Sequence, residues 1–360
     1  MDQAKLEELL HRVVGDLGAT ISAGNSVVGY RLGLFTALAE RPMTSAELAS
    51  ATDTDERYVR EWARGQAAGG YITYDPAADA YSLTEEQVAV VADPDGAVYA
   101  PAAFLLSLAA LRSEPRVTEA FRTGEGMGWH EHNPDLFVGT EQFFRPGYLA
   151  NLVASWLPAL DGMEEKLRAG GKVADIGCGL GASTVLMAEA FPQSRFVGSD
   201  YHGESIELAR KRAADAGVAD RVAFEIATAQ TFGGHGYDLV TTFDALHDMG
   251  DPLGAARHVR EVLAPEGTWM IVEPFAGDKV EQNLNPVGRI FYNASTFLCV
   301  PNAKSQQGEY ELGAPSASEF VHHFLVLIPG HWTATLITVQ EVGSVATELG
   351  SQAAQAAGAV

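Results

Sequence analysis

Three glycines in a short run, Gly177, Gly179 and Gly181, give the clearest chemical signal in this 360-residue sequence. They follow a short apolar stretch that ends in Asp175, and a helix-compatible run from 182 to 191 comes after them. Glycines permit a sharp turn and let a ligand approach the backbone where a Cβ would clash. A glycine-rich turn between a strand and a helix is typical of a nucleotide-binding α/β unit. We therefore expect a nucleotide-like ligand at this turn.

A second acid supports this expectation. The segment 195–200 predicts another strand and ends in Asp200, about nineteen residues after the turn. An acid at this spacing is placed to accept hydrogen bonds from the hydroxyl groups of a ribose.

The type of nucleotide depends on Asp175. The spacing Gly177-x-Gly179-x-x-Ala182 also fits the fingerprint of dinucleotide-binding proteins, so an NAD-linked oxidoreductase is one alternative. In such proteins the turn and the helix N-terminus hold a pyrophosphate, which the Asp175 carboxylate would repel. S-adenosylmethionine (SAM) carries no phosphate and bears a sulfonium and an ammonium group. An acid at the turn therefore favours SAM over NAD.

The sequence around the turn also predicts the fold. Strand-like segments at 221–226, 237–243 and 268–273 alternate with helical patterns such as 255–263. This alternation indicates a parallel sheet with helices on both faces. Ligands bind such sheets beyond the C-terminal ends of the strands. Five polar residues are expected at that edge: Asp175, Asp200, Thr228, Asp244 and Glu273.

One histidine follows the fourth predicted strand of this sheet and is the candidate base. His247 lies near the expected place of the reacting group. A histidine with a pKa near 6.5 is neutral at pH 7 and can take a proton from a hydroxyl acceptor. Glu273, at the end of the next strand, could orient a substrate. We predict that His247 and Glu273 are catalytic; a structural role for His247 is the alternative.

Residues 34–83 have a different pattern. Three short helices, the second opened by a capping box at Thr44 and Glu47, precede a β-hairpin at 71–83. This order predicts a winged helix, which raises the alternative of a SAM-binding transcriptional regulator. The third helix, however, holds three arginines against three acids between 55 and 64, whereas DNA contacts favour a positive surface. We expect a dimerisation domain that also walls the substrate site.

The segment between these two regions contains a glycine-rich loop at 124–134. His130, Glu131 and His132 lie together in it, so a metal site is conceivable. Two histidines in a flexible loop are more often solvated or turned toward a substrate, and we predict no metal. Two aromatic residues, Phe144 and Tyr148, follow this loop. An aromatic face can stabilise a sulfonium; packing in the protein interior is the alternative role for these two rings. The predicted substrate and cap residues are Trp129, His130, Phe144, Tyr148 and Tyr292.

Several of these motifs resemble a known family. The segment 173–181 resembles the first motif of class I SAM-dependent methyltransferases, and Asp200 resembles their second-strand acid. The segment 246–251 resembles the stretch that supplies the catalytic histidine in small-molecule O-methyltransferases, with Met249 where an aromatic residue is usual. A winged helix, a helical segment and a SAM domain in this order resemble the same enzymes and a related bacterial group of winged-helix methyltransferases.

The resemblance implies an α/β Rossmann-like SAM methyltransferase domain with a mainly helical N-terminal winged-helix domain. It also implies methyl transfer from SAM to a small molecule, on oxygen, with S-adenosylhomocysteine (SAH) as product. Thr228 stands where the family usually has an acid that contacts the adenine amine, and the Ala229 backbone could replace that contact. The implied cofactor contacts are Asp175, Gly177, Cys178, Gly179, Gly181, Asp200, Tyr201, Thr228, Ala229, Phe243 and Asp244.

We predict four regions: a winged-helix and dimerisation domain at 1–90, a helical linker and active-site cap at 91–165, the SAM-binding methyltransferase domain at 166–345, and a disordered tail at 346–360. The formal net charge of −23 disfavours nucleic acid as a partner. Two cysteines provide no disulfide framework, so the cytoplasm is the expected compartment. A homodimer is expected from the winged helix as dimerisation domain. The longest apolar stretch, 102–111, is too short to span a bilayer, and no membrane partner is expected.

Overall fold

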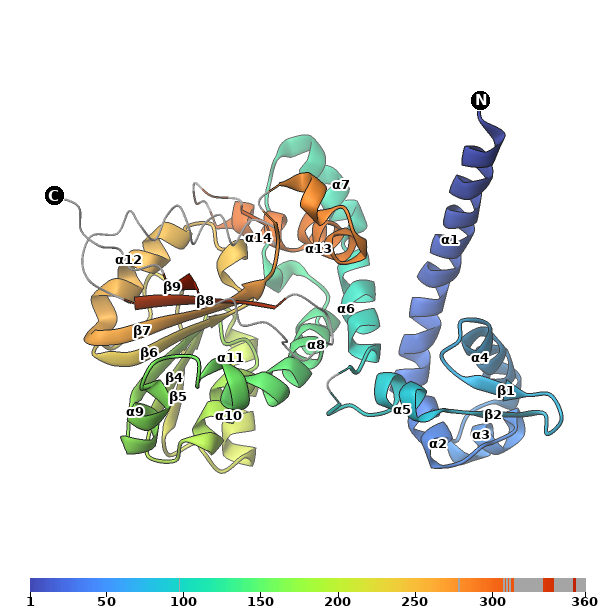
Figure 1. Cartoon of the computed structure of the whole chain (residues 1–360), viewed down its shortest axis with the longest axis horizontal. Helices are drawn as coiled ribbons and strands as arrows, with labels where there is room; N and C mark the ends of the chain where they lie inside the picture. Colours follow the sequence, from blue (N-terminus) through green and yellow to red (C-terminus); the bar gives the residue numbers. More distant parts are fainter. Residues whose placement is uncertain are drawn as a thin grey trace. The chain divides into compact units, whose positions relative to one another are not determined.

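The computed structural model describes residues 1–96, 98–277, 279–306, 308, 310, 312–313, 333–339 and 352–353 (Figure 1). Contacts divide the chain into two compact units. The first combines Met1–Ala109 with Val138–Pro146, and the second combines Ala110–Phe137 with Gly147–Val360. The predicted linker at 91–165 is thus shared between both units; the domain boundaries themselves remain predictions.

The first unit is a winged helix built on a long N-terminal helix. Two of its helix N-caps follow from the sequence. Thr44 and Glu47 form the predicted capping box, and the Asp55 side chain accepts hydrogen bonds from backbone N–H groups at the start of α4. The strands β1 and β2 pair antiparallel as the wing. Its elements are α1 (Gln3–Arg31), α2 (Leu34–Glu40), α3 (Ser45–Ala51), α4 (Glu56–Ala68), β1 (Thr73–Asp75), β2 (Ala80–Ser82), α5 (Glu85–Val91) and α6 (Pro101–Leu111).

The second unit is an α/β domain around one sheet in the order β5-β4-β3-β6-β7-β8-β9. Its strands are parallel except for β9, which pairs antiparallel with β8. The strands are β3 (Lys172–Ile176), β4 (Arg195–Asp200), β5 (Val222–Ile226), β6 (Tyr237–Phe243), β7 (Leu263–Pro274), β8 (Thr333–Val339) and β9 (Gln352–Ala353).

The helices of this unit join and flank those strands (Figure 1). They are α7 (Glu114–Thr123), η1 (Trp129–Glu131), α8 (Asp135–Asn151), η2 (Leu152–Trp156), α9 (Met163–Ala169), α10 (Ala182–Ala190), α11 (Gly203–Asp215), η3 (Leu246–Asp248), α12 (Pro252–Val262), η4 (Val280–Asn283), α13 (Pro286–Phe297) and α14 (Cys299–Ser305). Only the two ends of α8 belong to this unit, because Val138–Pro146 is part of the first unit.

Successive residues of the central strands point to opposite faces and feed two separate cores. Val173 and Leu239 belong to one core with residues of α9, α10 and α11. Their chain neighbours Ala174 and Val240 belong to the other, with residues of α12. The near-continuous apolar strands follow from this burial on both faces. The predicted fold class is confirmed.

β3 lies between β4 and β6, so the connections leave it in opposite directions. Ligands of open α/β sheets bind at this kind of switch point, outside the carboxyl ends of the strands. The glycine turn follows β3 directly, which puts it at that position.

The described residues of the predicted tail at 346–360 are Gln352 and Ala353, which form β9; the other residues of this stretch lie outside the described part of the chain. None of the helices described here combines the length and the apolar character that crossing a membrane requires.

Candidate active site

The glycine turn requires its glycines for two different reasons. Gly177, Gly179 and Gly181 have φ values of +68°, +51° and +76°, the left-handed region that glycine adopts without a Cβ clash. A Cβ on Gly181 would come within 2.8 Å of the Phe224 ring, whereas one on Gly179 would meet nothing within 4 Å. The backbone at Gly179 therefore faces open space, as expected where a ligand approaches.

Asp175 lies buried next to this turn, with 1% of its surface exposed. The hydroxyls of Ser183, Thr184 and Thr241 donate to its carboxylate over 2.7, 2.6 and 2.8 Å. Burial raises the pKa of Asp175, and the three hydroxyls oppose that rise. The carboxylate thus joins β3 to β6 and to the first turn of α10. From the sequence we expected Asp175 to lie against the ligand. In the structure protein hydroxyls surround its carboxylate, and its contact with the cofactor remains a prediction.

Asp200 connects the second strand to the glycine turn. Its Oδ2 accepts the N–H of Gly179 over 3.0 Å, and its Oδ1 accepts the N–H of His202 over 2.8 Å. Burial raises the pKa of this carboxyl, while the two N–H groups lower it. The two acids predicted from sequence therefore both organise the turn, Asp175 from the helix side and Asp200 from the neighbouring strand.

The remaining predicted cofactor residues gather on the same edge of the sheet. Cys178 is buried within the turn, and burial raises the pKa of its thiol. Tyr201 follows Asp200 and is half-exposed. Thr228 is exposed after β5 and shares a 2.9 Å hydrogen bond with the Thr231 hydroxyl, while Ala229 is buried.

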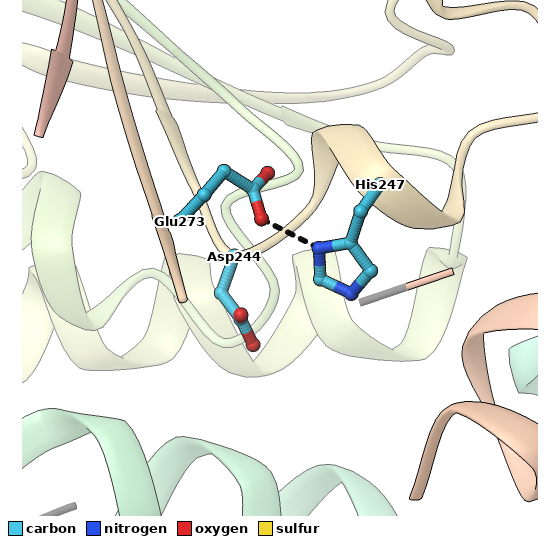
Figure 2. A group of neighbouring side chains, drawn as sticks. All are labelled: Asp244, His247 and Glu273. Carbon is cyan, nitrogen blue, oxygen red and sulfur yellow. Dashed lines mark hydrogen bonds and ion pairs between the residues drawn. The ribbon is translucent and has the colours of Figure 1, made fainter. Parts of the chain in front are cut away.

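Glu273 and His247 form a buried pair at the ends of β7 and β6. Figure 2 shows the two side chains turned toward one another. His247 Nδ1 lies 2.5 Å from Glu273 Oε2. Glu273 Oε1 also accepts the N–H of Leu246 over 2.8 Å. One carboxylate therefore fixes both the turn η3 and the imidazole. A proton on Nδ1 leaves Nε2 as the ring nitrogen that can accept one.

The pKa of His247 lies well above its ordinary value of 6.5. Burial lowers it, but the negative charge of Glu273 and a hydrogen bond with Cys299 outweigh the burial. From the ordinary pKa of histidine we expected His247 to be neutral at pH 7. In the folded protein Glu273 stabilises the imidazolium, so His247 keeps its proton to higher pH than an ordinary histidine does.

Asp244 lies next to this pair and has an unusual backbone. Its φ is +50°, and its N–H donates to the carbonyl of Val272 over 2.8 Å. Its Oδ1 is buried and has no hydrogen-bond partner among the described residues. Burial raises the pKa of this carboxyl well above its ordinary value.

A divalent cation could in principle use the same three side chains. One ligand atom each from Asp244, His247 and Glu273 lies within 4.8 Å of the others (Figure 2). This is the one such group of three among the described residues, so His130, Glu131 and His132 do not come together. Our expectation of no metal remains a prediction.

Aromatic rings surround the end of β6. Phe243 lies 5.3 Å from Tyr148 and 6.1 Å from Trp156, measured between ring centroids. Trp156 comes from η2, a short π-helical turn, and was not predicted; an isolated tryptophan ahead of the first strand gives no chemical signal. Phe144 belongs to the first unit, where its ring packs 4.9 Å from Phe143, and its role as a pocket wall remains a prediction.

The predicted cap residue Trp129 reaches η3, the turn that carries His247. Its Nε1 donates to Asp248 Oδ2 over 2.7 Å, and its backbone N–H donates to Tyr201 Oη over 3.2 Å. His130 is exposed, with its ring 6.4 Å from that of Tyr201. Tyr292 lies elsewhere in the unit, where its hydroxyl accepts a hydrogen bond from Asn283 over 3.2 Å.

Comparisons with known proteins identify two domains in the chain. Residues 167–313 match a family described as a methyltransferase domain, and residues 19–93 match the Rv2258c-like winged HTH domain. Over 103 residues the chain is 37% identical to the 27-O-demethylrifamycin SV methyltransferase of Amycolatopsis mediterranei. That match covers 28% of this chain and 38% of the relative's length, well under two thirds of it.

Two solved structures resemble the chain over most of its length. Mitomycin 7-O-methyltransferase has a TM-score of 0.65 at 20% identity, with 91% of this chain and 93% of that chain covered. Human N-acetylserotonin methyltransferase, in complex with SAM, has a TM-score of 0.65 at 16% identity, with 96% of both chains covered. At these identities the likeness establishes the fold. Together with the two domain matches, it confirms the predicted order of the domains, a winged helix-turn-helix domain ahead of a methyltransferase domain.

Proposed function

We propose that this protein transfers a methyl group from SAM to an oxygen atom of a small molecule, with His247 as general base. The observation that carries the proposal is the buried His247–Glu273 pair, which lies on the same sheet edge as the glycine turn. The names of the rifamycin and mitomycin methyltransferases, which both act on oxygen, support the choice of acceptor atom.

The residues at the sheet edge fit SAM. Open space at Gly179 admits a ligand to the backbone, and Asp200 offers a carboxylate for ribose hydroxyls. The rings of Phe243, Tyr148 and Trp156 provide aromatic faces of the kind that stabilise a sulfonium. When bound, SAM supplies an electrophilic methyl group on a good leaving group.

The chain itself contributes alignment, exclusion of water and movement of one proton. His247 Nε2 takes the proton of the acceptor hydroxyl, and Glu273 holds the resulting imidazolium through Nδ1. Because the pKa of His247 is raised, its proton must leave before the base can act. Glu273 is therefore a positioning residue, which keeps the imidazole in one orientation and one tautomer.

We also propose that two copies associate through α1. Apolar side chains at Leu10, Val14, Leu17 and Ile21 form one exposed stripe, since they are spaced by three, four and seven residues. In Figure 1 the first half of this helix extends away from α2–α5. A stripe of this kind on a long helix is typical of helix pairing. Both cysteines are free, which fits a reducing compartment, the cytoplasm.

The regulator alternative receives no support from the winged helix. In α4, Arg57 pairs with Glu61 over 2.6 Å, and Arg60 pairs with Glu56 over 2.7 Å. Arginines bound to acids of their own helix are poor candidates for phosphate contacts. A salt-sensitive gel shift with duplex DNA would reverse this judgement.

Two measurements test the proposed function. Calorimetry should show binding of SAH and none of NAD. A screen of phenols, carboxylic acids and amines with methyl-labelled SAM should then yield label on a hydroxyl or carboxyl oxygen. Absence of SAH binding removes the whole proposal, and label on amines alone removes the assignment to oxygen.

A further inference from the structure

A hydrogen-bond network joins the loop that carries Trp129 to the turn that carries His247. The indole Nε1 of Trp129 donates to Asp248 Oδ2 over 2.7 Å, and Asp248 follows His247 within η3. Asp248 is buried. Among the described residues, its carboxylate accepts a hydrogen bond from the indole N–H of Trp129. A buried carboxylate held by one donor depends strongly on that donor.

A second connection comes from α14. Asn302 Nδ2 donates to the backbone carbonyl of Asp248 over 3.0 Å, while its Oδ1 accepts the N–H of Trp129 over 3.2 Å. Tyr201 Oη lies 3.2 Å from the same Oδ1. Asn302 is buried, and its amide thus joins the loop, the turn and the end of β4. All four segments belong to the second unit.

We propose that Trp129 is a positioning residue for His247 and that it acts through Asp248. The indole N–H anchors the side chain next to the base, and Asn302 anchors the backbone at the same place. The turn is then held on one side by Glu273 and on the other by the loop. This inference rests on the proposed function, because it concerns the residue assigned there as the base.

Electrostatics give the contact a measurable consequence. Burial raises the pKa of Asp248 to about 6, and the charge of His247 and the Trp129 N–H both oppose that rise. Without the N–H, the pKa of Asp248 rises further, and less of the carboxylate is ionised at neutral pH. His247 then loses part of a neighbouring negative charge, so its own pKa falls.

Other charged groups also face these two residues. The pKa of His247 also depends on Glu273, Asp244 and Cys299, and these three residues are unchanged in every variant used below. The negative charges of Asp200 and Glu273 raise the pKa of Asp248, and the charge of Asp248 raises the pKa of Tyr201. A change in the pKa of His247 that follows loss of the indole N–H alone therefore reports the Trp129–Asp248 contact.

A packing role for Trp129 predicts something different. Its ring lies 5.9 Å from the Phe137 ring and 6.4 Å from the His132 ring. Trp129→Phe keeps an aromatic ring in this place and removes the N–H. If packing is the whole role, this variant should keep the wild-type titration of His247.

The experiment is a titration of the histidine ring nitrogens by NMR in the full-length protein, with the His247 signals assigned by their loss in His247→Gln. We expect Trp129→Phe to lower the proton affinity of His247 about tenfold, which is one pKa unit. Asp248→Asn keeps an oxygen acceptor for the indole but removes the charge, so it should lower that affinity at least as much. In the double variant, Trp129→Phe should add nothing to Asp248→Asn.

The matched control is Trp62→Phe in the winged helix, which removes another buried indole N–H, bonded to the carbonyl of Asn25 over 2.9 Å. It should leave the His247 titration unchanged. A wild-type titration in Trp129→Phe, or an equal shift in the Asp248→Asn background, overturns the inference. The titration needs no methyl acceptor, and SAH binding is measured separately, so failure of the proposed function is recognised by itself. With an acceptor in hand, Trp129→Phe should lower kcat about tenfold at pH values above the pKa of His247, where the base is deprotonated in both proteins, and leave KM for SAM within about twofold.

Discussion

Glu273 holds His247 through two bonds to the same turn. Its Oε2 lies 2.5 Å from the imidazole Nδ1, and its Oε1 accepts the N–H of Leu246, the residue before the histidine. The backbone that carries the imidazole and the imidazole itself are thus fixed by one side chain of the neighbouring strand. Both side chains are almost fully buried, at 3% and 1% exposed for His247 and Glu273, so water does not compete for these bonds.

Glu273→Gln tests this arrangement. The glutamine oxygen can still accept the Leu246 N–H, but its amide nitrogen would then donate to His247 Nδ1. The ring proton would have to move to Nε2, the nitrogen that the mechanism needs free. We expect kcat to fall about 100-fold or more, with SAH affinity nearly unchanged. Glu266→Gln, an exposed position on the same strand, is the control and should keep wild-type activity. Wild-type turnover in Glu273→Gln would remove the pair from the mechanism.

The activity should rise with pH. The pKa of His247 lies above its ordinary value, and the base is the deprotonated form, so activity is low below that pKa and increases as pH passes through it. Removing the charge of Glu273 lowers the pKa of His247, which should move the midpoint of this rise to lower pH. The check is kcat/KM from about pH 5 to about pH 10 for wild type and the residual activity of Glu273→Gln. A profile that falls over this range contradicts a histidine base.

Two glycines of the turn should respond differently to alanine. Gly181→Ala places a Cβ 2.8 Å from the Phe224 ring at φ +76°, so strain and overpacking together should cost roughly 2–4 kcal/mol of the free energy of unfolding. Gly179→Ala meets no atom within 4 Å at φ +51° and should cost about 1–2 kcal/mol.

The same Cβ at Gly179 enters the space where the cofactor is proposed to approach. Gly179→Ala should therefore weaken SAH binding about tenfold or more, beyond what its small loss of stability explains. Thermal unfolding and calorimetry with SAH measure the two effects. Equal SAH affinity in Gly179→Ala and wild type would place the cofactor elsewhere.

Local patterns in the sequence predicted local structure well. The capping box at Thr44 and Glu47 and the left-handed glycines after β3 depend only on neighbouring residues, and the structure has them. The alternating strands and helices likewise predicted the sheet, because apolar periodicity and turn residues are local properties.

Contacts between distant segments were beyond the reach of these patterns. His247 and Glu273 were both singled out, but their pairing depends on how β6 and β7 align, with Thr242 opposite Ile271 and Phe243 opposite Val272. Asp175 was expected to face a ligand, and the hydroxyl that helps to enclose it comes from Thr241 on a neighbouring strand. Register across a sheet cannot be read from the spacing within one strand.

Asn302 and Cys299 were missed for the same reason. Both lie on α14, more than fifty residues after His247 in the sequence, and neither belongs to a recognisable motif. A buried asparagine in a helix of mostly apolar residues is the signal that could have drawn attention to Asn302, since buried polar side chains need partners.

The proposed pairing of two copies through α1 leads to a last prediction. Leu17 and Ile21 lie on the apolar stripe and are 63% and 76% exposed, so they make few contacts within their own chain. Leu17→Glu with Ile21→Glu should leave the folded chain intact but place four negative charges at the contact between two copies. We expect the wild type to have the mass of a dimer in light scattering and the variant that of a monomer. Ala19→Glu, on the opposite side of the helix, adds charge without touching the stripe and should remain dimeric. A monomeric wild type, or a dimer that survives both substitutions, contradicts the assignment of this face.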